Sequence, residues 1–236
     1  MTLMIRSPLT LSVLSLAAML APMTARGQVG HPPQRSPYED IVMGQNLTLS
    51  AGWLAVRRDP ANVAPNASAF ASARYDASIG GPAALYVRYT FAPSERRLLA
   101  PANPLATRVL STPSVNTTVI DGGLDLSLTG RKTWKRLAPA ITAGLGIASD
   151  FAKADTGAYR FGTKFAFTYG LGLRFIPRSG LSFRADLTNY TWQYQYPDRY
   201  FIKAADSTSV LTDTRVRSKY KGNWGLSAGL TIPVFR

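Results

Sequence analysis

Residues 164–175 read KFAFTYGLGLRF, and every second residue of this stretch is large and apolar. The apolar set is Phe165, Phe167, Tyr169, Leu171, Leu173 and Phe175, and the alternate positions carry small, polar or basic residues. A period of two is the spacing of a β-strand with one apolar face. That face points into a core in a soluble sandwich or barrel, and out into lipid in an outer-membrane barrel.

The same alternation recurs along the chain to its last residues. Eight strands are predicted, at 46–56, 69–79, 84–91, 118–128, 140–148, 164–175, 181–192 and 224–235. Most of them come near the roughly 9–11 residues that a tilted strand needs to cross the hydrocarbon of a bilayer. Long connections (57–68, 92–117, 149–160, 193–222) alternate with short ones (80–83, 129–137, 177–180), as in an up-and-down barrel with both termini in the periplasm.

The composition indicates an exported basic protein. The chain has 236 residues, a formal net charge of +14 and no cysteine, which excludes disulfides and thiolate metal sites. Residues 1–27 combine Arg6, an apolar stretch at 9–21 and the segment APMTARG, and are predicted to be a secretory signal peptide. Residues 28–45 are predicted to be a flexible periplasmic lead-in, and 46–236 the barrel. An exported basic protein favours outer-membrane lipid or lipopolysaccharide as its partner over nucleic acid.

The face opposite the apolar one favours the membrane barrel. It carries Gly144, Gly146, Gly170, Gly172, Gly225 and Gly229, where a water-exposed face usually carries Lys, Glu, Gln and Thr. Glycine weakens an exposed strand, whereas in a narrow lumen it leaves room for large side chains from across the barrel. The charges on this face are nearly balanced: Arg74, Arg88, Lys164, Arg174 and Arg184 against Asp76, Asp121, Asp125 and Asp186.

Buried charges must be paired, so this balance predicts an interior charge network. We therefore predict an all-β, eight-stranded antiparallel up-and-down transmembrane β-barrel. The alternative is a secreted, soluble lipocalin-like barrel with the apolar face turned inward.

The sequence resembles a small bacterial outer-membrane β-barrel protein of the outer-membrane protein A-like or porin-like eight-stranded class. The resemblance covers about residues 46–236. Segment 125–149 (DLSLTGRKTWKRLAPAITAGLGIAS) is similar to a down-strand, basic periplasmic turn and up-strand of such barrels. The resemblance implies insertion by the barrel assembly machinery, although the chain ends IPVFR rather than in an aromatic residue.

Few residue patterns indicate chemistry. The only histidine, His31, lies in the proline-flanked lead-in, where no fold positions it for a catalytic triad. One histidine and no cysteine give no metal site of the usual kind. Asp121 and Asp125 share a strand face and could do acid–base work, but we favour them as partners of the interior arginines. We predict no catalysis, no cofactor and no small-molecule substrate.

The last long connection carries a basic and an aromatic group. The basic residues are Arg199, Lys203, Arg215, Arg217, Lys219 and Lys221, which either face lipopolysaccharide phosphates or are simply solvated. The aromatic residues are Tyr190, Trp192, Tyr194 and Tyr196. In strict register these four point into the barrel mouth, and a bulge near Asn189 would turn them outward as an aromatic girdle. We predict the girdle, with a platform for a glycan or an apolar ligand as the alternative.

These features together predict a structural or envelope-interaction barrel with a filled interior. A narrow passive pore is the second hypothesis, and an enzyme acting on envelope lipid is the third.

Overall fold

The computed structural model describes residues 36–41, 44–178 and 181–235. The predicted signal peptide (1–27), the first part of the lead-in and His31 lie outside the described residues. Within the described ranges, no helix is both long enough and apolar enough to span a bilayer.

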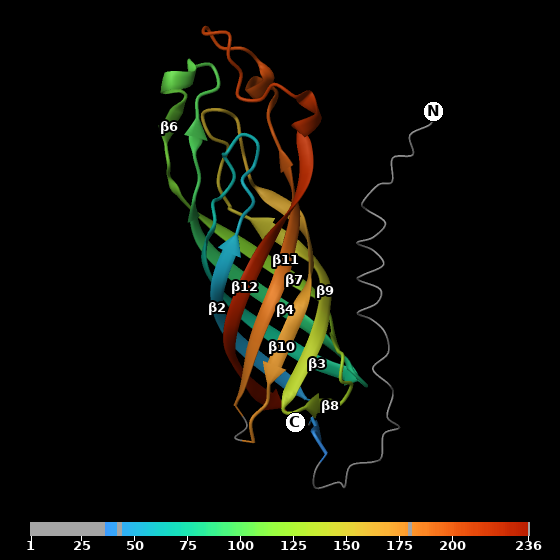
Figure 1. Ribbon diagram of the computed structural model, residues 1–236. Helices are drawn as coiled ribbons and strands as arrows, with labels where there is room; N and C mark the ends of the chain where they lie inside the picture. Colours follow the sequence, from blue (N-terminus) through green and yellow to red (C-terminus); the bar gives the residue numbers. More distant parts are fainter. Residues whose placement is uncertain (1–35, 42–43, 179–180, 236) are drawn as a thin grey trace, which may run out of the picture. The chain divides into compact units, whose positions relative to one another are not determined.

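Eight long strands form one closed barrel in the described part of the chain (Figure 1). They are β2 (Gln45–Ala55), β3 (Ser68–Gly80), β4 (Ala83–Glu95), β7 (Ser114–Ser127), β9 (Leu137–Ser149), β10 (Thr163–Phe175), β11 (Ser182–Gln195) and β12 (Ser218–Phe235). Each pairs antiparallel with the next, and β12 pairs with β2 to close the ring. All eight predicted strands are therefore confirmed, and so is the up-and-down order.

The last strand is longer than predicted. β12 begins at Ser218 rather than Trp224, because β11 and β12 remain paired up to Gln195 opposite Ser218. This two-stranded ribbon rises toward the loop end of the barrel (Figure 1), and it carries the aromatic residues of the last connection with it.

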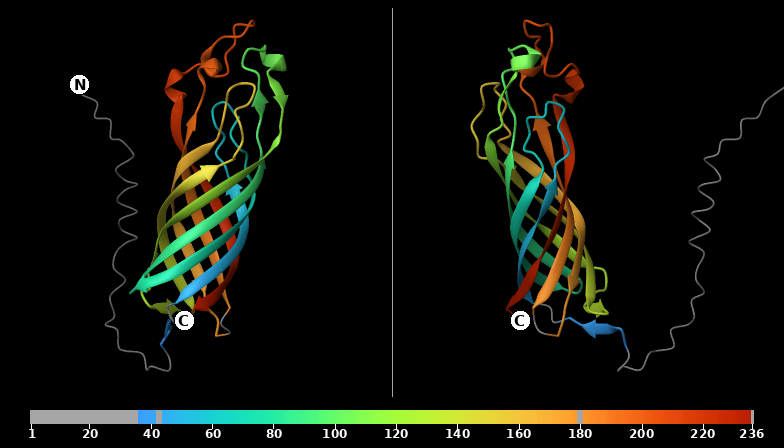
Figure 2. Two further views of the ribbon diagram at one scale, coloured as in Figure 1. Left: turned by 180° about the vertical axis from the view of Figure 1, so that it is seen from behind. Right: turned by 60° about the vertical axis from the view of Figure 1, so that its left-hand side comes forward.

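Four loops lie at one end of the barrel and the short turns at the other (Figures 1 and 2). We name them loop 1 (56–67), loop 2 (96–113), loop 3 (150–162) and loop 4 (196–217). Loop 2 holds β5 (Leu98–Leu99), β6 (Val109–Ser111) and the 3-10 turn η2 (Leu105–Thr107). Loop 4 holds the 3-10 turns η3 (Asp198–Phe201) and η4 (Thr214–Val216). At the opposite end, β1 (Tyr38–Asp40) pairs with β8 (Lys132–Trp134), so part of the segment predicted as a lead-in adds a strand to a turn.

The apolar face of each strand lies on the outside of the barrel. In β10, Phe165, Phe167 and Leu171 are 50, 44 and 58% exposed, whereas Ala166 and Thr168 between them are buried. The same alternation of exposed apolar and buried residues runs through β3, β4, β7 and β12. A continuous exposed apolar surface of this kind is the lipid-facing band of a transmembrane barrel. The soluble lipocalin-like alternative is therefore wrong.

The luminal glycines have the expected role at some positions and a second role at others. An added Cβ at Gly146 would lie 2.1 Å from the Ile120 carbonyl oxygen, and one at Gly170 would lie 2.3 Å from that of Leu187. At these two positions, and at Gly229, the nearest atom is therefore a backbone carbonyl oxygen of a neighbouring strand, where the narrow barrel coils sharply. At Gly144, Gly172 and Gly225 the nearest atom belongs to a larger side chain, so glycine makes room for it as expected.

Candidate functional site in the lumen and loops

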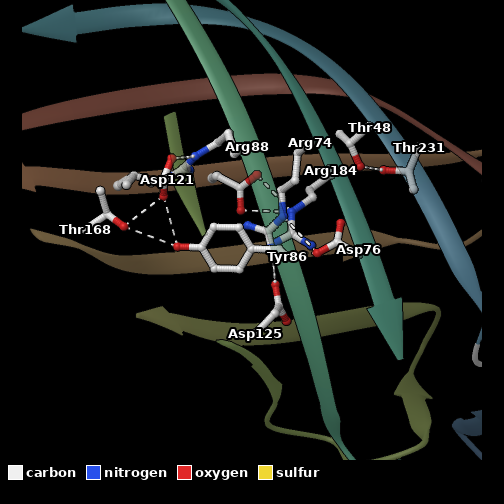
Figure 3. Close-up of polar contacts among 12 residues, drawn as sticks. Thr48, Arg74, Asp76, Tyr86, Arg88, Asp121, Asp125, Thr168, Arg184 and Thr231 are labelled. Carbon is white, nitrogen blue, oxygen red and sulfur yellow. Dashed lines mark hydrogen bonds and ion pairs between the residues drawn. The ribbon is translucent and has the colours of Figure 1, made fainter. Parts of the chain in front are cut away.

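The turn-side half of the lumen holds a cluster of five charged side chains, of which Arg74, Asp125 and Arg184 are among those labelled in Figure 3. Arg74 contacts Asp76 at 2.7 Å and also reaches Asp125 across the lumen. Arg184 contacts Asp125 at 2.6 Å and Asp186 at 2.9 Å. Asp125 therefore bridges two arginines that come from strands on different sides of the barrel. All five residues are buried.

The sequence places these charges by a short repeated pattern. Arg74 and Asp76 on β3 are two residues apart, and so are Arg184 and Asp186 on β11. Because side chains two apart on a strand share a face, each arginine has one carboxylate next to it. Asp125 then enters from β7 and joins the two local pairs.

A second charged layer lies on the loop side of this cluster. Asp121 accepts hydrogen bonds from Arg88 Nε at 3.0 Å and Nη2 at 2.8 Å, a bidentate contact. The hydroxyls of Tyr86 and Thr168 donate to the same carboxylate at 3.1 and 2.9 Å. The Tyr86 ring also stacks under Arg74, 4.1 Å from the guanidinium carbon to the ring centroid. Tyr86 therefore lies between the two layers and contacts a residue of each.

Two of the predicted interior charges lie apart from these ion pairs. Arg174 is on the luminal face, but it donates to neutral acceptors, Ser182 Oγ at 3.1 Å and Asn46 Oδ1 at 3.2 Å. Lys164 is half-buried near the loop end of β10, opposite Ala148, and has no ion-pair partner among the described residues. Its place in the network was a wrong expectation, because the luminal carboxylates lie lower in the barrel.

The aromatic group points inward, not outward. Tyr190, Trp192, Tyr194 and Tyr196 are each 3% exposed or less. The pairing of β11 with both neighbours runs through Asn189 without a bulge, so the strict register is kept. The predicted girdle of these four residues is therefore wrong. They close the lumen above Arg88, whose guanidinium carbon lies 5.0 Å from the Tyr190 ring centroid.

Loop side chains complete this aromatic plug. Tyr159 of loop 3 and Tyr200 of loop 4 stack with Tyr196, with ring centroids 6.0 to 6.2 Å apart. Phe161 packs edge-on against Trp192 at 5.9 Å. The resulting hydrophobic cluster includes residues of loops 1, 2, 3 and 4. The loop end of the lumen thus holds rings, while the half nearer the turns holds charged side chains.

Polar contacts fix the loops around the plug. In loop 1, the Asp59 carboxylate accepts hydrogen bonds from the backbone N–H groups of Ala61, Val63 and Ala64 and from the Tyr196 hydroxyl at 2.8 Å. Burial, with the negative Asp59 beside the hydroxyl, raises the pKa of Tyr196 well above its ordinary value. The tyrosine is therefore neutral, and its hydroxyl donates a hydrogen bond to Asp59.

Loop 2 is tied to loops 3 and 4. Arg96 forms a buried ion pair with Asp155 of loop 3 at 2.9 Å. Arg108 donates to Thr208 and Ser209 carbonyls of loop 4, each at 3.2 Å. In return Asp206 of loop 4 accepts the Leu105 N–H at 2.7 Å. Hydrogen bonds from Thr208 and Leu105 lower the pKa of Asp206 to about 2.

The predicted basic group does not form one patch. Arg217 is paired with Asp198 at 2.5 Å and lies over the Phe201 ring. Lys221 is half-buried and donates to the Arg58 carbonyl at 2.7 Å. The four remaining side chains are exposed, without an ion-pair partner in the described part of the chain: Arg199, Lys203, Arg215 and Lys219.

A barrel with an ionised, hydrogen-bonded lumen and an apolar exterior is the inverse of a soluble protein and suits only a bilayer. The chain folds as an outer-membrane β-barrel. No family model and no curated protein matches the sequence. Among solved structures, the barrel is similar to the Yersinia pestis outer-membrane protein Ail in a phospholipid bilayer nanodisc, with 15% identity and a TM-score of 0.40, over 80% of this chain and 99% of that one. Ail in complex with the heparin analogue sucrose octasulfate gives 16% identity and a TM-score of 0.34, over 80% and 100% of the two chains. Values this low carry no argument, and the fold assignment rests on the closed strand pairing of this chain.

Several residues of the barrel's interior and loops had no role assigned from sequence. Tyr86 lies in the predicted strand 84–91 opposite its apolar face, but alternation gives no hint that it joins two charged layers. Asp59 precedes Pro60, and an Asp-Pro pair is a turn signal that could have indicated its hydrogen bonds to the following backbone. Tyr159 and Phe161 lie in a loop without periodicity, and no local signal marks them as plug residues.

Proposed function

We propose that this chain is a structural, non-catalytic outer-membrane barrel with a filled, charge-paired interior, and that its loops contact the anionic lipopolysaccharide layer. The proposal is supported by the side chains that occupy the lumen at three levels. Ion pairs around Asp125 and Asp121 occupy two levels, and the aromatic plug around Trp192 occupies the third. A lumen of eight strands is only wide enough for side chains to fill, so we expect no continuous path for ions.

The engagement of the carboxylates supports the absence of catalysis. Asp121 and Asp125 were the candidate acid–base pair, but each is held by arginine. Both carboxylates therefore serve as ion-pair partners of the interior arginines, as the sequence led us to favour. In the described ranges, no group of three or more His, Cys, Asp or Glu side chains is arranged to hold a metal ion.

The contact with lipopolysaccharide is supported by the loop charges. Exposed, unpaired cations such as Arg199, Lys203 and Arg215 stand at the end of the barrel opposite the turns. Cationic side chains at a membrane surface are attracted to anionic headgroups. Insertion by the barrel assembly machinery belongs to the same proposal and follows from the barrel class.

Conductance in planar lipid bilayers tests the filled lumen. We expect the purified protein to give no steady conductance steps, whereas the double variant Trp192→Ala/Tyr194→Ala, which removes two rings of the plug, should show increased leak. An open porin in the same bilayers serves as the positive control. Regular ion-conducting steps from the unmodified protein would overturn the proposal in favour of a narrow pore.

A further inference from the structure

A pocket of 260 Å³ lies between loop 1 and the start of loop 2, outside the lumen. Its wall includes two arginines, Arg58 from loop 1 and Arg97 from loop 2, and two asparagines, Asn62 and Asn66. The pocket includes none of the luminal charged residues and none of the basic residues of loop 4, so the proposed function gives it no role.

Both arginines are free to bind an anion. Arg58 and Arg97 are exposed, and within the described residues their side chains have no hydrogen-bond or ion-pair partner. Lys221 holds the Arg58 carbonyl at 2.7 Å and brings a third cation to the pocket's edge. The only carboxylate in the wall, Asp59, already accepts hydrogen bonds from three backbone N–H groups and from Tyr196. The pocket therefore presents unpaired positive charge.

The register fixes the level of the pocket relative to the bilayer. Ala55, the last residue of β2, pairs with Trp224 on the outer face, and the Trp224 ring contacts that of Tyr169, with centroids 6.0 Å apart. Tryptophan and tyrosine on the outside of a membrane protein gather at the headgroup level. Arg58 follows Ala55 by three residues, so the pocket opens just beyond this aromatic band, where headgroup phosphates lie.

We propose that this pocket binds a phosphate group of an outer-leaflet glycolipid, with Arg58 and Arg97 as the two ligands. Guanidinium groups suit phosphate because each offers two parallel N–H donors to the oxygens. The Asn62 and Asn66 amides are placed to receive the adjoining sugar hydroxyls. The inference rests on the proposed function in one respect, namely that the loop end faces the outer leaflet.

The test measures lipid retention by native mass spectrometry of the full-length mature barrel released from detergent micelles. The probes are diphosphoryl lipid A, the same lipid with its phosphates removed, and inorganic phosphate. We expect retention of diphosphoryl lipid A only, weakened about tenfold or more in Arg58→Gln/Arg97→Gln, since charged hydrogen bonds are lost at two sites. Arg58→Lys/Arg97→Lys, which keeps the charge but not the forked donors, should retain an intermediate amount.

The matched control is Arg131→Gln/Lys132→Gln, which removes the same charge from the turn end and should leave retention unchanged. Heat-modifiable migration on gels shows that each variant is folded. Equal loss in this control, equal retention of the dephosphorylated lipid, or displacement by equimolar inorganic phosphate would each overturn the inference. If Arg199→Gln/Lys203→Gln/Arg215→Gln loses the lipid while the pocket variant keeps it, this inference fails and the proposed function stands. If none of the variants changes retention, the lipopolysaccharide contact fails as well.

Discussion

Removal of the Asp121 carboxylate is expected to be the most damaging conservative change in the lumen. Its side chain is fully buried, and Arg88 directs two N–H groups at it, at 3.0 and 2.8 Å. Asp121→Asn keeps the shape but leaves the Arg88 guanidinium charged and buried, with only neutral acceptors, namely the new amide oxygen and Thr188 Oγ1 at 3.0 Å. Breaking a buried ion pair by removing one partner costs about 3–5 kcal/mol.

The double variant separates this effect from a simple loss of packing. In Arg88→Met/Asp121→Leu neither charge remains, so the desolvation penalty disappears with the ion pair. Replacement of a buried pair by apolar residues of similar volume is often neutral or stabilising. We therefore expect the double variant to be more stable than Asp121→Asn alone by about 2 kcal/mol or more.

Urea-induced unfolding from lipid vesicles, followed by the fluorescence of the four tryptophans, measures the free energy of unfolding of Asp121→Asn and of the double variant. A loss of 3–5 kcal/mol lowers the folding equilibrium constant about 150- to 5000-fold. Arg131→Gln in an exposed turn is the control and should be within about 0.5 kcal/mol of the unmodified protein. The reasoning is refuted if Asp121→Asn costs less than about 1 kcal/mol. It is also refuted if the double variant loses as much stability as Arg88→Met and Asp121→Leu lose separately, added together.

Four further outcomes follow from the fold. Leu171→Arg should destabilise the barrel by about 2–4 kcal/mol in the same unfolding assay, because it places a charge in the lipid-facing band on the turn side of Tyr169, whereas Leu171→Met should be mild; a reversed order would contradict the outward face. Gly146→Ala should destabilise it by about 1–3 kcal/mol, since the new Cβ would lie 2.1 Å from the Ile120 carbonyl oxygen, and a neutral result would contradict that close approach. In this cysteine-free chain, an impermeant thiol reagent on whole cells should label Ser207→Cys and spare Arg131→Cys; the opposite pattern would invert the topology. The hydrogen bond that the Leu105 N–H donates to the Asp206 carboxylate is complete above the unfolded pKa of about 3.9 and is lost only as the pH falls through about 2, so the Leu105 amide chemical shift should be unchanged at pH 4.

The sequence predicted the barrel because alternation is a local property. Residues 164–175 show their two faces without reference to any other strand. The glycine-rich second face then indicated which of the two points into the lumen. The paired positions Arg74–Asp76 and Arg184–Asp186 were equally local, since they lie two apart on one strand. These signals gave eight strands, their order and the inward direction of most of the charges.

The tertiary structure decided which residues meet across the lumen. The position of Asp125 between Arg74 and Arg184 depends on how β7 is staggered against β3 and β11, and the closure of the barrel brings together Thr48 and Thr231, hydrogen-bonded at 2.8 Å. Alternation fixes a face but not the stagger between strands, which is set by the tilt and shear of the closed ring.

The aromatic plug shows the same limit most clearly. From sequence alone, a bulge at Asn189 and a continuous ladder were both compatible with the spacing of Tyr190, Trp192, Tyr194 and Tyr196, and a shift of one residue turns every side chain to the other face. In the structure β11 stays paired in continuous register, because the inward rings pack against residues of loops 1 to 4 that are distant in the sequence. The inward or outward direction of a strand end is thus decided by what packs against it, and that information lies in the folded chain rather than in the strand.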